Sequence, residues 1–190
     1  MRIVAGQWRG RKLSAPPGEV TRPTADRTRE TLFSMLVSRI GAFEGLSVGD
    51  FFAGSGALGI EALSRGAATC LFVEQDAAAI RALRANLAAM RAQPQSDVRA
   101  QSVLALGLAK APLDLLLLDP PYGSGAGHVA LDKLLRLGWI GPASWVSLET
   151  HADEVINLKG FEADAERKVG KARITLLRVA PAREPAAQTG

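Results

Sequence analysis

Cysteine and histidine are scarce in this chain of 190 residues, which has one cysteine, Cys70, and two histidines, His128 and His151. A single cysteine excludes an internal disulfide and a cysteine-rich zinc site. The histidines lie 23 positions apart without a cluster of other ligand residues around them, so we expect no metal. Cys70 borders an apolar segment and is expected to be a small core residue.

Long hydrophobic runs are also absent, since no apolar segment reaches the roughly 18 residues of a transmembrane helix. The first residues lead to Gly6, Trp8 and Arg9 instead of the apolar segment of a signal peptide. With 47% hydrophobic and 22% charged residues, the composition is typical of one compact globular domain. We therefore expect a cytoplasmic, monomeric protein without a membrane partner.

Charge is unbalanced only at the start of the chain. Residues 1–30 carry seven basic and three acidic side chains, whereas residues 31–190 carry 16 of each. The net charge of +4 therefore lies in the N-terminal sixth and indicates an anionic partner; the alternative is a solvated basic arm that binds nothing. The seven basic residues are Arg2, Arg9, Arg11, Lys12, Arg22, Arg27 and Arg29.

The predicted elements alternate between strands and helices, which indicates an α/β fold with a doubly wound, Rossmann-like, mostly parallel sheet. We expect a short basic hairpin arm over residues 1–23, packed on one domain over 24–180, and a flexible tail over 181–190. Helices are predicted over 24–39, 60–65, 77–91, 104–109 and 129–137. Strands are predicted over 46–52, 69–74, 98–103, 113–118, 145–149 and 172–179, with a shorter element near 161–167.

A glycine-rich turn follows the first predicted strand. The segment Gly54–Gly59 has the G-x-G-x-x-G spacing before a helix. Glu74 ends the next strand, where a carboxylate can accept hydrogen bonds from the hydroxyls of a ribose. Asp50 adds negative charge that suits the sulfonium of S-adenosylmethionine better than the pyrophosphate of a dinucleotide. The alternatives are a purely structural turn and an Asp50 that hydrogen-bonds the loop.

A second motif, Asp119-Pro120-Pro121-Tyr122, follows the apolar segment 113–118. Two prolines cannot continue a central strand, so the motif is expected at the rim where parallel sheets bind ligands. A carboxylate and a carbonyl can accept hydrogen bonds from both N–H groups of an amine conjugated to an aromatic ring, which makes the nitrogen more nucleophilic. Tyr122 can stack on a nucleic-acid base that carries such an amine. The alternative is that Asp119 caps a turn and Tyr122 covers the edge of the core.

Together the two motifs resemble class I S-adenosylmethionine-dependent methyltransferases that methylate amino groups. Residues 2–13, 22–33 and 52–65 are most similar to the RsmD family, and the resemblance runs from Arg2 to about Val179. It implies methylation of the N2 amine of one guanine in bacterial 16S ribosomal RNA, within the small ribosomal subunit or its assembly intermediate. The alternatives are an amino-methyltransferase acting on DNA or protein glutamine, and a non-catalytic ribosome assembly factor.

The resemblance also implies roles for individual residues. Such enzymes often have Asp or Asn after the third strand, where this chain has Ser102, which would hydrogen-bond adenine more weakly. Trp8 is expected either to stack on RNA or to pack under the arm. The implied cofactor contacts are Asp50, Gly54, Gly56, Glu74, Gln75 and Ser102; the implied guanine contacts are Asp119, Pro120, Pro121 and Tyr122; the implied RNA contacts are Arg9, Arg11, Lys12, Arg22, Arg27 and Arg29.

Overall fold

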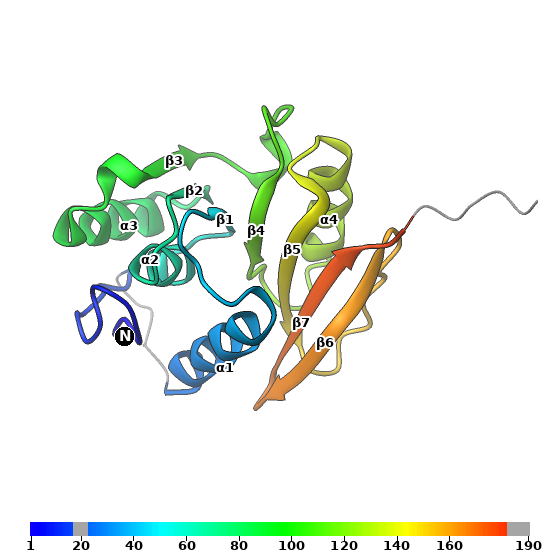
Figure 1. Cartoon of the computed structure of the whole chain (residues 1–190), viewed down its shortest axis with the longest axis horizontal. Helices are drawn as coiled ribbons and strands as arrows, with labels where there is room; N and C mark the ends of the chain where they lie inside the picture. Colours follow the sequence, from blue (N-terminus) through cyan, green and yellow to red (C-terminus); the bar gives the residue numbers. More distant parts are fainter. Residues whose placement is uncertain (17–22, 182–190) are drawn as a thin grey trace, which may run out of the picture.

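The computed structural model describes residues 1–16 and 23–181, which contain one seven-stranded sheet with helices on both faces (Figure 1). The helices are α1 (Pro23–Ile40), α2 (Ala57–Ser64), α3 (Ala77–Met90) and α4 (Ala126–Arg136), with 3₁₀ turns η1 (Gln93–Gln95) and η2 (Val103–Ala105). The strands are β1 (Ser47–Phe51), β2 (Thr69–Glu74), β3 (Ser96–Ala100), β4 (Leu113–Leu118), β5 (Ile140–His151), β6 (Phe161–Val169) and β7 (Ala172–Val179).

The strand order is β3-β2-β1-β4-β5-β7-β6. Strands β1 to β5 pair in parallel, whereas β7 is antiparallel to both β5 and β6. The chain winds outward from β1 in one direction and returns to start β4 on its other side, so the switch between the two halves lies between β1 and β4. Such a switch opens a crevice at the carboxyl ends of the strands. The predicted doubly wound, mostly parallel sheet is confirmed.

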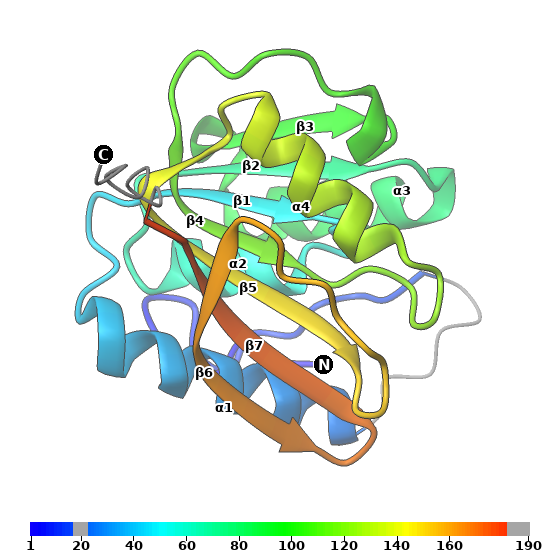
Figure 2. The ribbon, with the colours of Figure 1, turned by 90° about the vertical axis from the view of Figure 1, so that its right-hand side faces the viewer.

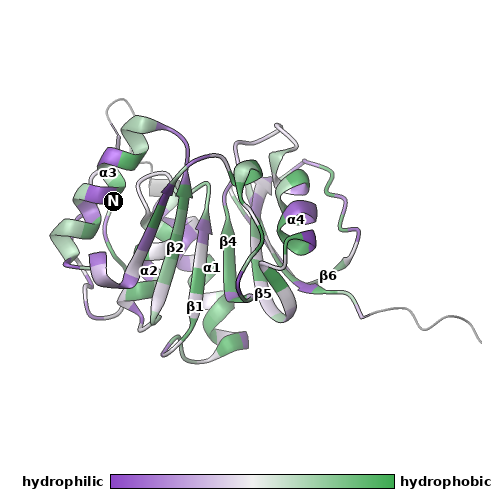
Figure 3. Cartoon of the chain, turned by 90° about the horizontal axis from the view of Figure 1, so that it is seen from above, coloured by the Kyte–Doolittle hydropathy of each residue, from purple (hydrophilic) through white to green (hydrophobic). Residues whose placement is uncertain are grey.

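The core has two layers because successive side chains of a strand point to opposite faces. In β4, Leu115 and Leu117 pack with the apolar faces of α1, α2 and α3, whereas Leu116 and Leu118 pack with α4. Figure 2 shows α4 over its face of the sheet. All four leucines are buried, each contributing about 1.5–3 kcal/mol, and most of β4 is coloured hydrophobic in Figure 3.

Several element boundaries differ from the predicted ones. β1 ends at Phe51 because Phe52 has a left-handed backbone, with a φ of 65°. β3 lies two to three residues earlier than predicted, and the predicted helix over 104–109 is only the turn η2, since Leu106 is already extended with a ψ of 139°. α1 begins at Pro23 and α4 at Ala126, both earlier than predicted, and β5 is longer at both ends.

Within residues 1–16, the N-terminal arm has one isolated β-bridge, between Arg2 and Lys12, and lies along α2. The buried carboxylate of Glu61 accepts hydrogen bonds from the backbone N–H groups of Val4 and Ala5 at 2.8 and 3.0 Å. These bonds fix the arm to the helix that follows the glycine-rich turn.

Trp8 packs beneath the arm and is nearly buried. Its backbone N–H donates to Ser64 Oγ at 3.0 Å, and its side chain is 9% exposed and belongs to the core layer of α1, α2 and α3. Of the two expected roles of Trp8, the structure supports packing. Arg22 and the predicted tail beyond Pro181 lie outside the described residues. Within residues 1–16 and 23–181, no helix has the length and apolar character needed to cross a membrane.

Candidate active site

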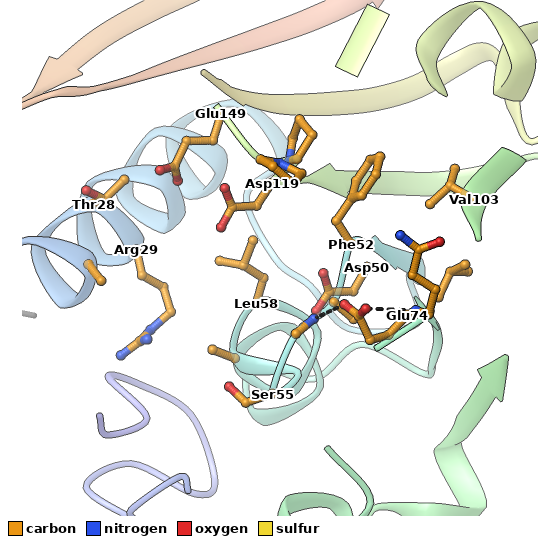
Figure 4. A pocket seen from close by; sticks show the side chains of 18 of the residues that line it. Thr28, Arg29, Asp50, Phe52, Ser55, Leu58, Glu74, Val103, Asp119 and Glu149 are labelled. Atoms are coloured by element: carbon orange, nitrogen blue, oxygen red, sulfur yellow. Dashed lines mark hydrogen bonds between the residues drawn. The ribbon is translucent and has the colours of Figure 1, made fainter. Parts of the chain in front are cut away.

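A cavity of about 700 Å³ lies at the carboxyl ends of the central strands (Figure 4). Its volume is in the range of small-molecule binding sites. The cavity brings together the glycine-rich turn after β1, the end of β2, the segment after β3, the motif after β4 and the end of β5. Its polar and motif residues include Asp50, Gly54, Ser55, Glu74, Gln75, Ser102, Asp119, Pro120, Pro121, Tyr122 and Glu149.

Glu74 holds the glycine-rich turn in place. Its Oε2 accepts a hydrogen bond from the Gly54 N–H at 2.8 Å, and its Oε1 accepts from the N–H groups of Gln75 and Asp76 at 2.7 and 2.8 Å. A carboxylate has about four acceptor positions, so Glu74 has capacity left for a ligand hydroxyl. The turn is therefore positioned before any ligand binds.

Asp50 is 1% exposed and also lines the cavity. Its Oδ2 accepts the backbone N–H of Gly59 at 2.8 Å, so Asp50 does hydrogen-bond the loop, as one of its two expected roles requires. The pKa of Asp50 is raised to about 7, chiefly by burial; the hydrogen bond from Gly59 lowers it, and the negative charge of Glu74 adds a smaller increase. A cation bound in the cavity would stabilise the ionised form of Asp50.

The glycines of the turn serve different purposes. Gly54 lines the cavity with a φ of 55°, a conformation that favours glycine. Gly56 is not among the residues that line the cavity, and a Cβ there would lie 2.3 Å from Leu83 Cδ1 on α3. Gly59 faces Phe72 on β2 in the same way, at 2.3 Å. The missing side chains of Gly56 and Gly59 therefore allow the start of α2 to pack closely against α3 and β2.

Ser102 lies just beyond β3 and lines the cavity. Its Oγ accepts the backbone N–H of Leu104 at 3.2 Å and caps η2. The hydroxyl proton is still able to donate to a ligand.

The motif after β4 forms the opposite wall of the cavity. Pro120 is buried, whereas Asp119 is exposed at the cavity and Tyr122 is 46% exposed. The Tyr122 hydroxyl donates to Glu149 Oε1 at 2.5 Å, and burial together with the carboxylates of Glu149 and Asp119 raises the pKa of that hydroxyl well above its usual value. The bond orients the Tyr122 ring at the cavity mouth.

Glu149 is a cavity residue that the sequence prediction missed. It lies in β5, the strand beside β4, and burial raises the pKa of its carboxyl group while the bond from Tyr122 lowers it. The available signal was its position at the end of the predicted strand 145–149, next to the strand that carries Asp119.

The predicted RNA contacts divide into two groups. Arg9, Arg11, Lys12 and Arg27 are exposed, although the Arg11 guanidinium also donates to the carbonyl of Ala89. Arg29 departs from the prediction because it is only 4% exposed.

The guanidinium of Arg29 has partners inside the protein. It forms an ion pair with Asp26 at 3.0 Å, donates to the carbonyl of Arg2 and lines the cavity. A buried guanidinium in this position cannot reach a phosphate on the surface, so Arg29 belongs to the cavity wall.

The chain is similar to known proteins over most of its length. A family model described as conserved hypothetical protein 95 matches residues 1–178. Ribosomal RNA small subunit methyltransferase D of Escherichia coli is 39% identical over 153 residues, covering 80% of this chain and 76% of the relative. The protein of the same name from Haemophilus influenzae is 39% identical over 160 residues, covering 81% and 80%.

Among solved structures, yhhF of Escherichia coli superposes with a TM-score of 0.81 at 34% identity, covering 94% of this chain and 97% of that one. The similarity therefore includes both the arm and the sheet. The chain belongs to the conserved hypothetical protein 95 family, and its resemblance to the RsmD family of methyltransferases is confirmed.

Proposed function

We propose that this protein transfers a methyl group from S-adenosylmethionine to the exocyclic N2 of a guanine in 16S ribosomal RNA of the small ribosomal subunit. The observation that carries the proposal is that the glycine-rich turn with Glu74 and the Asp119–Tyr122 motif line one cavity. The proposed cofactor site and the proposed acceptor site would therefore be adjacent, as a direct transfer between them requires.

The residues on the β1 and β2 side fit S-adenosylmethionine. Glu74 would accept a ribose hydroxyl, Gln75 and Ser102 would lie beside the adenine, and Asp50 would face the positive charge. When bound, the cofactor supplies a methyl group activated by its sulfonium. The fit rests on Glu74, which holds the turn through three backbone N–H groups and keeps an acceptor position for a hydroxyl, and on the buried Asp50 that lines the same cavity.

The residues on the β4 side would hold the acceptor base. The Asp119 carboxylate and the Pro120 carbonyl would each accept one hydrogen of the N2 amine, which orients its lone pair and increases its nucleophilicity. Tyr122 would stack on the base once it has left its own stack. The amine proton would leave either to Asp119 or to water.

The relatives support the choice of substrate. Two proteins at 39% identity are named as methyltransferases of small-subunit ribosomal RNA, and the exposed basic residues of the arm suit an RNA backbone. We therefore favour ribosomal RNA over DNA or protein glutamine as the substrate, and an enzyme over a non-catalytic assembly factor. We propose that the enzyme acts in the cytoplasm as a monomer.

The test uses small ribosomal subunits from a strain lacking this gene, incubated with the protein and isotopically labelled S-adenosylmethionine. After nuclease digestion, nucleoside mass spectrometry is expected to place the label in N2-methylguanosine from 16S RNA. Label in another nucleoside would refute the guanine N2 assignment, and labelling of naked DNA at a comparable rate would refute the choice of RNA.

A further inference from the structure

Asp119 and Glu149 are neighbours across two parallel strands. Leu118 of β4 and Leu148 of β5 are register partners, so the residues that follow them lie side by side at the edge of the sheet. Leu118 and Leu148 both point into the α4 layer of the core, and alternation sends the next side chains to the other face. Figure 4 shows the carboxylates of Asp119 and Glu149 pointing into the same part of the cavity.

The Glu149 carboxylate has capacity for a ligand. Within residues 1–16 and 23–181, its hydrogen-bond partner is the Tyr122 hydroxyl, which binds Oε1 at 2.5 Å. An ionised carboxylate accepts hydrogen bonds and donates none, and Oε2 is left for a donor in the cavity. Glu149 therefore favours an acceptor base that presents a second N–H beside its amine.

Guanine is the base that meets this requirement. Its Watson–Crick edge places the N1–H donor next to the N2 amine, whereas the ring nitrogen beside the amine is an acceptor in adenine and in cytosine. The side-chain amide of glutamine has no second N–H group beside its NH₂. An acceptor facing an acceptor leaves both unpaired in a desolvated site, which opposes binding of the wrong base.

We propose that Glu149 is a specificity-determining residue that accepts the N1–H of guanine while Asp119 holds the N2 amine. The inference rests on the proposed function and extends it, because it explains why this site would take guanine instead of another amine. The Tyr122 ring would stack on the base, while its hydroxyl occupies Oε1 of Glu149 and leaves Oε2 for the N1–H.

The test compares guanine with 2-aminopurine, which keeps the amine but has an acceptor at N1. Small subunits are reconstituted from 16S RNA that carries either base at the methylated position, introduced by ligation of a synthetic fragment. The ratio of kcat/KM values for the two bases is measured for wild type, Glu149→Gln, Tyr122→Phe and Glu162→Gln. Glu162 is exposed on β6 and provides the matched loss of charge.

An amide can donate to the N1 of 2-aminopurine, so Glu149→Gln is expected to reduce the guanine preference by about 100-fold. Tyr122→Phe removes the hydroxyl but keeps both carboxylates, so it should retain most of the preference, and Glu162→Gln should retain all of it. Binding of S-adenosylhomocysteine should stay within about twofold in every variant.

A wild-type preference in Glu149→Gln would overturn the inference. An equal loss in Tyr122→Phe would also overturn it, because Glu149 would then act only by holding the Tyr122 ring. If Glu149→Gln loses cofactor binding, Glu149→Asp decides: we expect a loss of about tenfold for guanine alone, and equal losses for both bases would contradict the role. Failure of wild type to form N2-methylguanosine would instead refute the proposed function.

Discussion

Gly54 and Glu74 are joined by a hydrogen bond of 2.8 Å from the Gly54 N–H to Glu74 Oε2, across the gap between the turn after β1 and the end of β2. The bond fixes the cofactor side of the cavity through backbone groups and one carboxylate. The acceptor side is built separately, from the Asp119–Tyr122 motif after β4. The two sides can therefore be disturbed one at a time.

Replacing Asp119 should separate catalysis from cofactor binding. We expect Asp119→Ala to lower kcat by about 1,000-fold or more, because the amine loses the group that orients it. The dissociation constant of S-adenosylhomocysteine, measured by calorimetry, should change by less than about twofold. Asp132→Ala, in an exposed ion pair with Arg136 on α4, is the control. A large loss of cofactor binding in Asp119→Ala would place Asp119 on the wrong side of the cavity.

Asp50 should make cofactor binding dependent on pH. Its pKa is about 7 in the folded protein, and a cation in the cavity binds the ionised form better. The dissociation constant of S-adenosylmethionine should therefore rise as the pH falls from 8 to 6, and Asp50→Asn should abolish most of this dependence. A flat profile in the wild-type protein would show that Asp50 does not face the positive charge.

The same residue should lower stability at high pH. The pKa of Asp50 in the folded protein is about 7, above its usual value of 3.8. The contribution of Asp50 to the free energy of unfolding is therefore fully present below pH 3.8 and is lost as the pH rises through about 7. Asp50→Asn should therefore raise the free energy of unfolding by a few kcal/mol more at pH 8 than at pH 5. Thermal unfolding at the two pH values measures this, and an equal effect at both would contradict the burial argument.

Two glycines of the arm provide a matched pair. Gly6 and Gly10 have φ values of 82° and 80°, but a Cβ on Gly6 would lie 1.8 Å from the carbonyl oxygen of Ser64, whereas Gly10 has open space. Gly10→Ala should cost about 1 kcal/mol of unfolding free energy from its backbone alone. Gly6→Ala should cost about 3 kcal/mol or more, because the arm must leave α2. Similar losses in denaturant unfolding would show that the arm is not closely packed.

The exposed basic residues of the arm should contribute to RNA binding through charge. Replacing Arg9 and Lys12 by Gln should raise the KM for small subunits and reduce the slope of log affinity against log salt by roughly one for each phosphate that is no longer neutralised. Arg136→Gln on α4, at the opposite face of the sheet, is the control and should leave the slope unchanged. An unchanged slope in the arm variant would support the alternative of a solvated arm.

The sequence predicted the sheet and the two motifs because these depend on local patterns. The apolar segment Leu113–Leu118 favoured a buried strand, and the prolines after it indicated that the strand ends at the rim. Turn boundaries were predicted less well, because the left-handed backbone of Phe52 is a tertiary feature that its side chain does not indicate.

Side-chain surroundings were harder still to predict. Arg29 looks like its basic neighbours in the sequence, but the fold buries it where α1 packs against the arm. Gly56 fits a cofactor motif, yet its missing side chain makes space for Leu83. Glu149 enters the cavity only because β5 pairs with β4 in one register. Each of these placements depends on contacts between distant segments.

One cavity is expected to hold both reactants, and a crystal structure with S-adenosylhomocysteine tests this most directly. We predict that the ribose contacts Glu74, and that the sulfur lies on the side of Asp50 and faces the space beside Asp119. A ligand bound elsewhere, or one whose sulfur points away from Asp119, would contradict the shared cavity.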